Sequence, residues 1–215
     1  MDGFDLVRSL KLLPGIILGL TVHEFSHAFI AHLCGDTTSR DQGRVTLNPL
    51  KHIDPLGFIM LFIAGFGWAK PVQFNEQNLR NPKTDVLKIA VAGPISNAVT
   101  AMLLSVVLII LNPLKSFNPT HGMYVLDEVL KYAININWVL FIFNLIPLPP
   151  LDGSHLLLSQ FRKFPRLYAG LYKYGSYILF ILILGYVFTG INLLPIGPLI
   201  NFFYKGFFSL FGFHV

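Results

Sequence analysis

Long apolar stretches separated by short polar connections dominate the chain. Four of them are long enough to cross a bilayer as helices, because a helix rises about 1.5 Å per residue and the hydrocarbon core is about 30 Å thick. These four stretches are residues 11–34, 86–111, 129–151 and 171–194. The pattern predicts a helical chain that passes through a membrane several times.

Two shorter apolar stretches leave alternatives open. Residues 53–68 are short for a span, so they could cross or form a re-entrant element, and residues 199–213 could cross or lie in the interface, where Phe and Tyr are favoured. Residues 44–47 and 72–74 are β-prone runs bounded by Gly, Pro and Asn, which indicates short strands at the membrane face. We therefore expect an α-helical multi-pass membrane protein with about four to six transmembrane helices and a small β-hairpin or re-entrant element.

Composition agrees with this fold class. The chain is 53% hydrophobic and only 13% charged, which excludes an ordinary soluble domain. Cys34 is its single cysteine, so an internal disulfide and a cysteine-based zinc site are excluded. The net charge of +5 does not indicate nucleic-acid binding, because the basic residues sit between apolar runs without a basic and aromatic motif.

The basic residues predict an orientation. If residues 53–68 do not cross, the connections that carry most of the positive charge lie on one side, and the positive-inside tendency makes that side cytoplasmic. The opposite connection, residues 112–128, offers only Lys115. The basic residues on the predicted cytoplasmic side are Arg40, Arg44, Lys51, Lys70, Arg80, Lys83, Lys88, Arg162, Lys163, Arg166 and Lys173.

An H-E-x-x-H motif, His23-Glu24-Phe25-Ser26-His27, lies inside the first apolar stretch. Residues four apart share one helix face, so both imidazoles can reach a single ion at about 2.0 to 2.1 Å. Glu24 beside that ion could take a proton from metal-activated water and deliver hydroxide to a carbonyl. A glutamate in hydrocarbon costs about 2.5 to 3.5 kcal/mol, so it should face a protein interior. These features predict a metal-assisted hydrolase.

The third long predicted span ends in Asn144-Leu-Ile-Pro-Leu-Pro-Pro-Leu-Asp152-Gly153. On the predicted topology Asp152 reaches the same side of the membrane as the two histidines. A zinc hydrolase commonly uses three protein ligands, so Asp152 is the expected third one. The three prolines in this segment prevent a regular helix and can bend the chain toward the first span. The alternative is an ordinary turn leaving the membrane, with Asp-Gly as turn residues.

These motifs, together with Gly93-Pro94-Ile95-Ser96-Asn97, resemble the three motifs of the site-2 protease family of intramembrane zinc metalloproteases. The connecting region resembles a compact prokaryotic branch without a PDZ domain. The resemblance implies one zinc ion bound by His23, His27 and Asp152, with Glu24 as general base. It also implies a single membrane-embedded protease domain over residues 1–215, with its motifs in 12–155 and C-terminal helices in 156–215. The expected location is the cell membrane, and the expected partners are the bilayer and a membrane protein or peptide that is cleaved near the cytoplasmic side.

Two asparagines in apolar runs are further candidates. By the family pattern Asn144 looks like a catalytic group that holds the scissile carbonyl or supports the site; the alternative for either asparagine is a hydrogen bond between helices. We expect a supporting role for Asn97, which forms a ridge of small residues with Gly93 and Ala101. Gly15 and Gly19 form a second ridge leading to the histidines, so close packing of the first two long helices is predicted.

The sequence contains weaker candidates for other sites and functions. His52 and His155 could be alternative ligands but fit interfacial positions better. Prenyl-peptide proteases use a Glu as third ligand, and neither Glu76 nor Glu128 lies in a suitable motif. A non-catalytic metal-binding or substrate-holding membrane protein stays open, although a structural metal site needs no base such as Glu24. The oligomeric state has no signature in the sequence.

Overall fold

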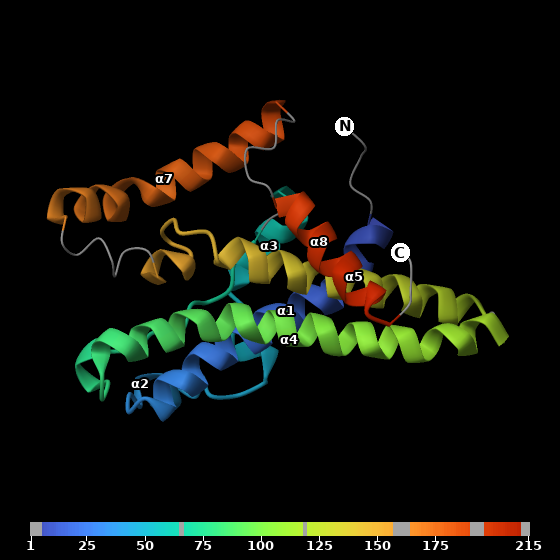
Figure 1. Cartoon of the computed structure of the whole chain (residues 1–215), viewed down its shortest axis with the longest axis horizontal. Coiled ribbons are helices and arrows are strands. Elements are labelled where there is room, and N and C mark those ends of the chain that lie inside the picture. Colours follow the sequence, from blue (N-terminus) through green and yellow to red (C-terminus); the bar gives the residue numbers. More distant parts are fainter. Residues whose placement is uncertain (1–5, 65–66, 118–119, 157–163, 190–195, 212–215) are drawn as a thin grey trace.

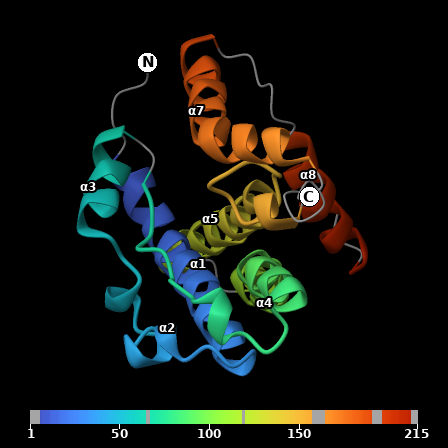
Figure 2. The ribbon, with the colours of Figure 1, turned by 90° about the vertical axis from the view of Figure 1, so that its left-hand side faces the viewer.

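Three long helices form the centre of the molecule. They are α1 (Leu6–Leu33), α4 (Pro82–Phe117) and α5 (His121–Asn144), and each packs against the other two. In the computed structural model α4 and α5 run side by side in opposite directions, and α1 lies against both (Figures 1 and 2). The structure describes residues 6–64, 67–117, 120–156, 164–189 and 196–211.

Short elements join α1 to α4. They are α2 (Thr38–Asp41), η1 (Pro49–Lys51), α3 (Pro55–Ala64) and η2 (Glu76–Asn78). After α5 come α7 (Pro165–Thr189) and α8 (Ile196–Ser209). Helix α8 covers α5, where Phe203 stacks on Trp138 with ring centroids 5.2 Å apart. Helix α7 lies apart from α1 and α4 in both views (Figures 1 and 2), and it contacts the turn after α5 at Pro149 through Gly175.

Most of each long apolar stretch is helical in the described residues. Among those residues, three helical segments are long and apolar enough to cross a membrane: α1, residues 82–113 of α4, and residues 166–185 of α7. The predicted span at 129–151 lies in α5, but this helix begins earlier and ends at Asn144, since the prolines that follow cannot continue it. Residues 190–194 of the fourth stretch, and Arg162 and Lys163, lie outside the described residues.

The two doubtful stretches form short helices. Helix α3 has 10 residues and therefore spans about 15 Å, half the hydrocarbon thickness. Helix α8 has 14 residues and spans about 21 Å. By length, neither crosses a bilayer alone.

The predicted β-hairpin is not formed. Residues 44–47 and 72–74 do not pair, and the described part of the chain contains a single isolated bridge, between Ile53 and Ala69. Side chains occupy the backbone acceptors instead. Arg44 Nη2 donates to Lys70 O at 2.5 Å, and the Ser39 hydroxyl donates to Gln73 O at 2.5 Å. Residues 67–75 therefore run as an irregular extended segment.

Asp36 fixes the far end of that extended segment. Its fully buried carboxylate accepts hydrogen bonds from the Thr38 hydroxyl at 2.6 Å, Asn78 Nδ2 at 2.9 Å and the Asn75 backbone N–H at 2.8 Å. Burial alone would raise the pKa of Asp36, but these donors outweigh it and lower the pKa. The segment is thereby tied to the C-terminal end of α1.

The small-residue ridge of α1 packs on α5, whereas the sequence suggested α4. A Cβ added to Gly15 would lie 2.6 Å from Ala133 Cα, and one added to Gly19 would lie 2.7 Å from Leu140 Cδ1. The ridge allows close approach of any helix, and α5 supplies the matching small surface at Ala133. This leaves the other side of α1 for α4.

Candidate metal centre

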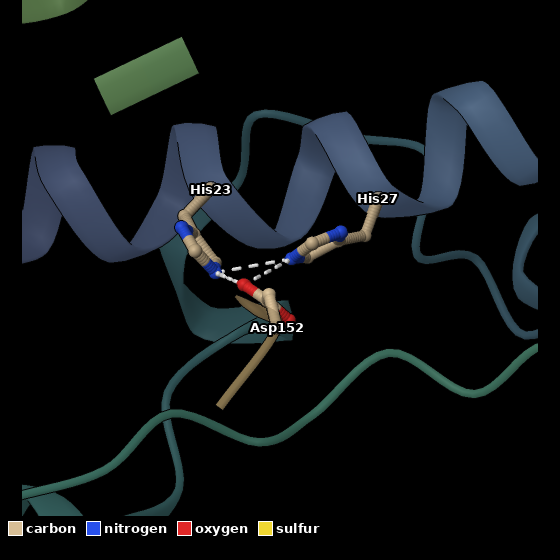
Figure 3. Close-up of side chains that lie close together, drawn as sticks. All are labelled: His23, His27 and Asp152. Atoms are coloured by element: carbon tan, nitrogen blue, oxygen red, sulfur yellow. Dashed lines mark hydrogen bonds and ion pairs between the residues drawn. The ribbon is translucent and has the colours of Figure 1, made fainter. Parts of the chain in front are cut away.

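Three potential ligand atoms converge between α1 and the turn after α5 (Figure 3). His23 and His27 project from adjacent turns of α1 with their Nε2 atoms 3.0 Å apart. Asp152 Oδ2 lies 3.1 Å from His23 Nε2 and 3.3 Å from His27 Nε2. The residues that the sequence proposed as metal ligands are therefore brought together.

The spacing of these atoms fits a zinc ion. Tetrahedral zinc with ligands at about 2.0 to 2.1 Å holds neighbouring ligand atoms about 3.3 Å apart, close to the three distances observed. Asp152 Oδ2 is buried and accepts no hydrogen bond from any described residue. A cation would satisfy this oxygen and leave a fourth tetrahedral position for water or substrate.

The outer nitrogens of the imidazoles provide an independent test. His23 Nδ1 lies 2.7 Å from Asn97 Oδ1, and His27 Nδ1 lies 2.7 Å from Ile89 O. Both partners are acceptors, so each Nδ1 carries a proton and the Nε2 atoms are the ones turned toward Asp152. With Nδ1 engaged in this way, each Nε2 can offer its lone pair to a cation lying between the two rings, whose Nε2 atoms are 3.0 Å apart.

Asn97 is fixed in turn by a buried amide network. Its Nδ2 donates to Gly19 O at 2.9 Å and to Asn137 Oδ1 at 3.0 Å, and Asn137 Nδ2 donates to Ala133 O at 2.8 Å. Both asparagines are fully buried. These donors determine which way each amide faces, so Asn97 must present its oxygen to His23. One network thus joins α1, α4 and α5 to a ligand of the metal.

Gly93 is the wall on which the ligand rings lie. A Cβ at this position would be 2.6 Å from His23 Cε1 and 2.7 Å from His23 Nε2, and it would also overlap His27 Nε2. Any side chain here would displace the imidazoles. The glycine of the second motif is thus required by the volume of the metal ligands.

The three ligands line a cavity of about 320 Å³, which we call the metal cavity. Glu24 borders this cavity as well. Its carboxylate is buried, and Oε2 accepts a hydrogen bond from the Val72 backbone N–H at 2.8 Å. Arg44 Nη2 lies 4.0 Å from the same oxygen. Among the residues described, none donates to Oε1, so this oxygen is available for proton transfer.

Of the remaining candidate residues, two line the cavity and one lies in the loop outside it. Asn144 and His155 line the cavity with the metal ligands, and Asn144 Nδ2 donates to Leu140 O at 3.0 Å. His52 is fully buried rather than interfacial, and its Nε2 donates to Thr46 O at 2.7 Å. Burial lowers the pKa of His52. It therefore supports the loop as a neutral side chain outside the ligand cluster.

Sequence reasoning missed three contributors to the site. The Val72 N–H holds Glu24, but a backbone donor has no residue signature. The sequence indicates Arg44 as a basic residue at the start of a predicted strand and gives no sign that its guanidinium is buried beside Glu24. Asn137 could have been found, because it is another amide inside an apolar run of α5.

Comparisons with known proteins agree with this geometry. The model of Peptidase family M50 matches residues 12–168. The "Putative zinc metalloprotease YwhC" of Bacillus subtilis is 39% identical over 168 residues, 73% of either chain. The "Putative zinc metalloprotease Rip2" of Mycolicibacterium smegmatis is 30% identical over 66% of this chain and 54% of its own length. Its Mycobacterium tuberculosis namesake is 31% identical over 70% and 57%. No solved structure shows a significant match.

The family match spans most of the chain and includes every residue of the ligand cluster. Zinc is the metal named for the relatives, and it is the metal that the donor set and spacing fit. The apolar helices make the protein an integral membrane metalloprotease. The chain belongs to peptidase family M50, the site-2 protease family.

Proposed function

We propose that this protein is a zinc-dependent intramembrane endopeptidase that cleaves transmembrane or membrane-embedded peptides near the cytoplasmic side of a prokaryotic cell membrane. One observation carries the proposal. The cavity that holds Glu24 and the His23, His27 and Asp152 cluster is lined by a helix, α1, that is apolar enough to span a bilayer. A substrate that reaches this cavity along α1 shares the membrane with the enzyme.

The chemistry divides between the ion and the chain. Zinc held by His23, His27 and Asp152 supplies a Lewis acid that acidifies water and polarises a carbonyl. Glu24 acts as general base through Oε1, while the Val72 N–H fixes Oε2. After removing a proton from the attacking water, Glu24 passes it to the departing amine.

Asn144 is proposed to orient the substrate. It lines the cavity opposite α1, and one of its two amide hydrogens donates to Leu140 O. No residue in the described part of the chain accepts the second hydrogen, which would donate to the scissile carbonyl and stabilise the developing negative charge. In this role Asn144 supports catalysis without binding the metal.

The orientation of the site follows from charge. His23 and His27 lie in the C-terminal half of α1. The connection from α1 to α4 carries five of the basic residues that favour the cytoplasmic side, and the first turns of α4 add Lys83 and Lys88. The proposal also has α5 crossing the membrane, which gives at least four spans. Asp152 then enters the site from the same side.

Substrate contact is proposed along the extended segment of residues 67–75. Pro71, Val72 and Phe74 border the cavity, so an unwound peptide can lie between this segment and the catalytic groups. Unwinding is necessary because a helical peptide hides its bonds in internal hydrogen bonds, whereas an extended peptide can pair its main chain with the enzyme.

The test is cleavage of a helical membrane peptide by the purified, zinc-loaded protein in vesicles. Glu24→Gln keeps the size of the side chain but removes the base, so we expect activity to fall about 10²- to 10⁴-fold at unchanged zinc content. Mass spectrometry of the products and elemental analysis supply the two readouts. A Glu24→Gln variant with full activity would exclude Glu24 as the base, and a wild type that cleaves nothing would exclude proteolysis.

A non-catalytic metal-binding or substrate-holding role is the second candidate. The buried Asn97 and Asn137 network favours it, since it ties the metal site to all three central helices. Asp152→Ala separates the two functions. A catalytic site predicts a folded, inactive protein of wild-type thermal stability, whereas a structural site predicts loss of the fold.

A further inference from the structure

A second cavity, which we call the apolar cavity, lies between α1, α3 and α5 and has a volume of about 240 Å³. In the described residues every side chain that lines it is uncharged and hydrophobic. Its walls include Ile17, Leu20, Leu61, Trp68, Val139 and Leu140. It shares no lining residue with the metal cavity.

The two cavities nevertheless follow one another along the same walls. On α1, Leu20 lines the apolar cavity and Glu24, one turn later, lines the metal cavity. On α5, Leu140 and Asn144 repeat this relation with the same spacing. The extended segment forms a third shared wall, because Trp68 borders the apolar cavity and Val72 the metal cavity. Figure 2 shows this segment passing in front of α1 between α3 and α4.

The geometry fixes which part of a peptide would reach the apolar cavity. One helical turn of four residues advances about 6 Å, and an extended peptide advances about 3.3 Å per residue. Side chains two apart in an extended peptide point to the same face. The apolar cavity therefore lies about two residues from the bond that is held at the metal cavity.

We infer that the apolar cavity is a specificity subsite that takes one large apolar side chain of the substrate, such as Leu, Met or Phe, about two residues from the scissile bond. The inference rests on the proposed proteolytic function. An apolar cavity of about 150 Å³ is enough to bind benzene, so this one holds a phenyl or isobutyl group. A charged side chain would lose its hydration there without gaining a partner.

The probe is a set of synthetic membrane-spanning peptides in phosphatidylglycerol and phosphatidylcholine vesicles, identical except for Ala, Leu, Phe, Trp or Asp at each position flanking the cleavage site. Differences of even one methylene in such pockets change kcat/KM by about 10- to 200-fold. We expect wild type to prefer Leu or Phe over Ala by at least about tenfold at one position, with Asp excluded there.

Ile17→Trp fills the apolar cavity and should shift the preference at that position to Ala, while zinc content stays unchanged. Leu18→Trp is the matched control, because Leu18 is the next residue of α1 but is 38% exposed. It should keep the wild-type preference. Leu61→Ala enlarges the same cavity and should shift the preference toward Trp, so the inference does not depend on the folding of Ile17→Trp alone.

Equal kcat/KM for Ala, Leu and Phe at every position would overturn the subsite while leaving proteolysis intact, as expected if lipid tails occupy the cavity. A wild-type preference retained in both Ile17→Trp and Leu61→Ala would overturn it as well. Failure of the wild type to cleave any peptide would overturn the proposed function together with the subsite.

Discussion

The metal cavity and the apolar cavity are built on the same walls yet depend on different forces. At about 320 Å³ and 240 Å³ they have comparable size, and α1 and α5 contribute to both. In the first, directional hydrogen bonds orient His23, His27 and Glu24. In the second, a bound side chain would be held only by the fit of its volume and by contact with apolar surface. The metal cavity, which holds the catalytic groups, and the apolar cavity, which is suited to binding a side chain, are therefore one helical turn apart on α1.

This contrast predicts unequal tolerance to substitution. A buried polar network loses much of its value when one member is changed, because the other members are left unsatisfied. An apolar cavity tolerates swaps that conserve volume. The sensitivity of the two cavities can therefore be compared with single substitutions of similar size.

The largest effect should follow from adding one methyl group at the metal cavity. In Gly93→Ala the new Cβ would overlap both imidazoles, so we expect zinc affinity to fall about 100-fold or more, measured by competition with a chelator. Gly122→Ala is the control, since a Cβ at Gly122 meets nothing within 4 Å. Equal zinc affinity in the two variants would show that the rings do not need this wall.

A smaller effect is expected from removing the outer partner of His23. Asn97→Ala deletes the acceptor that fixes the ring tautomer, and loss of such a partner typically weakens metal affinity or activity about 10- to 100-fold. Asn135→Ala, at an exposed position of α5, serves as control. If chelator competition gave wild-type affinity for Asn97→Ala, the amide network would be a helix contact alone.

The smallest effect belongs to the apolar cavity. Leu61→Met conserves volume and should cost less than about 1.5 kcal/mol in stability, with zinc content unchanged. Thermal unfolding in detergent and elemental analysis provide the measurements. Loss of zinc from Leu61→Met would mean that the two cavities are mechanically coupled and do not depend on separate forces.

The parts of the site that depend on local periodicity could be predicted from the sequence. His23 and His27 are four residues apart, and helical spacing alone places them on one face. Asp152 is 125 residues away from His27 along the chain, yet the predicted order of the spans pointed to it as a neighbour of the histidines, and the structure places it beside them. Gly93 and Asn97 could be identified because a small or polar residue in an apolar helix indicates close packing or a hydrogen bond to another helix.

Long-range details could not be read in the same way. The ridge of Gly15 and Gly19 predicts close packing against another helix, but it does not indicate whether that helix is α4 or α5. The hairpin prediction was wrong: residues 44–47 and 72–74 do not pair, Ser39 occupies Gln73 O inside the predicted second strand, and Arg44 occupies Lys70 O just before it. Such contacts connect residues 26 and 34 positions apart and leave no periodic pattern.

The hydrogen bond between His27 Nδ1 and Ile89 O makes the orientation of a metal ligand depend on the position of the α4 backbone. Side-chain substitutions cannot test this dependence. The acceptor of this hydrogen bond is a main-chain atom near the start of α4, so no change of side chain removes it. The apolar part of α4, residues 86–111, is about 39 Å long as a helix, which exceeds a hydrocarbon core of about 30 Å, and a hydrophobic stretch longer than the bilayer can adapt by tilting. A tilt of α4 relative to α1 would move this carbonyl relative to the imidazole. We therefore expect zinc affinity to depend on bilayer thickness, which the acyl-chain length of the host lipids sets.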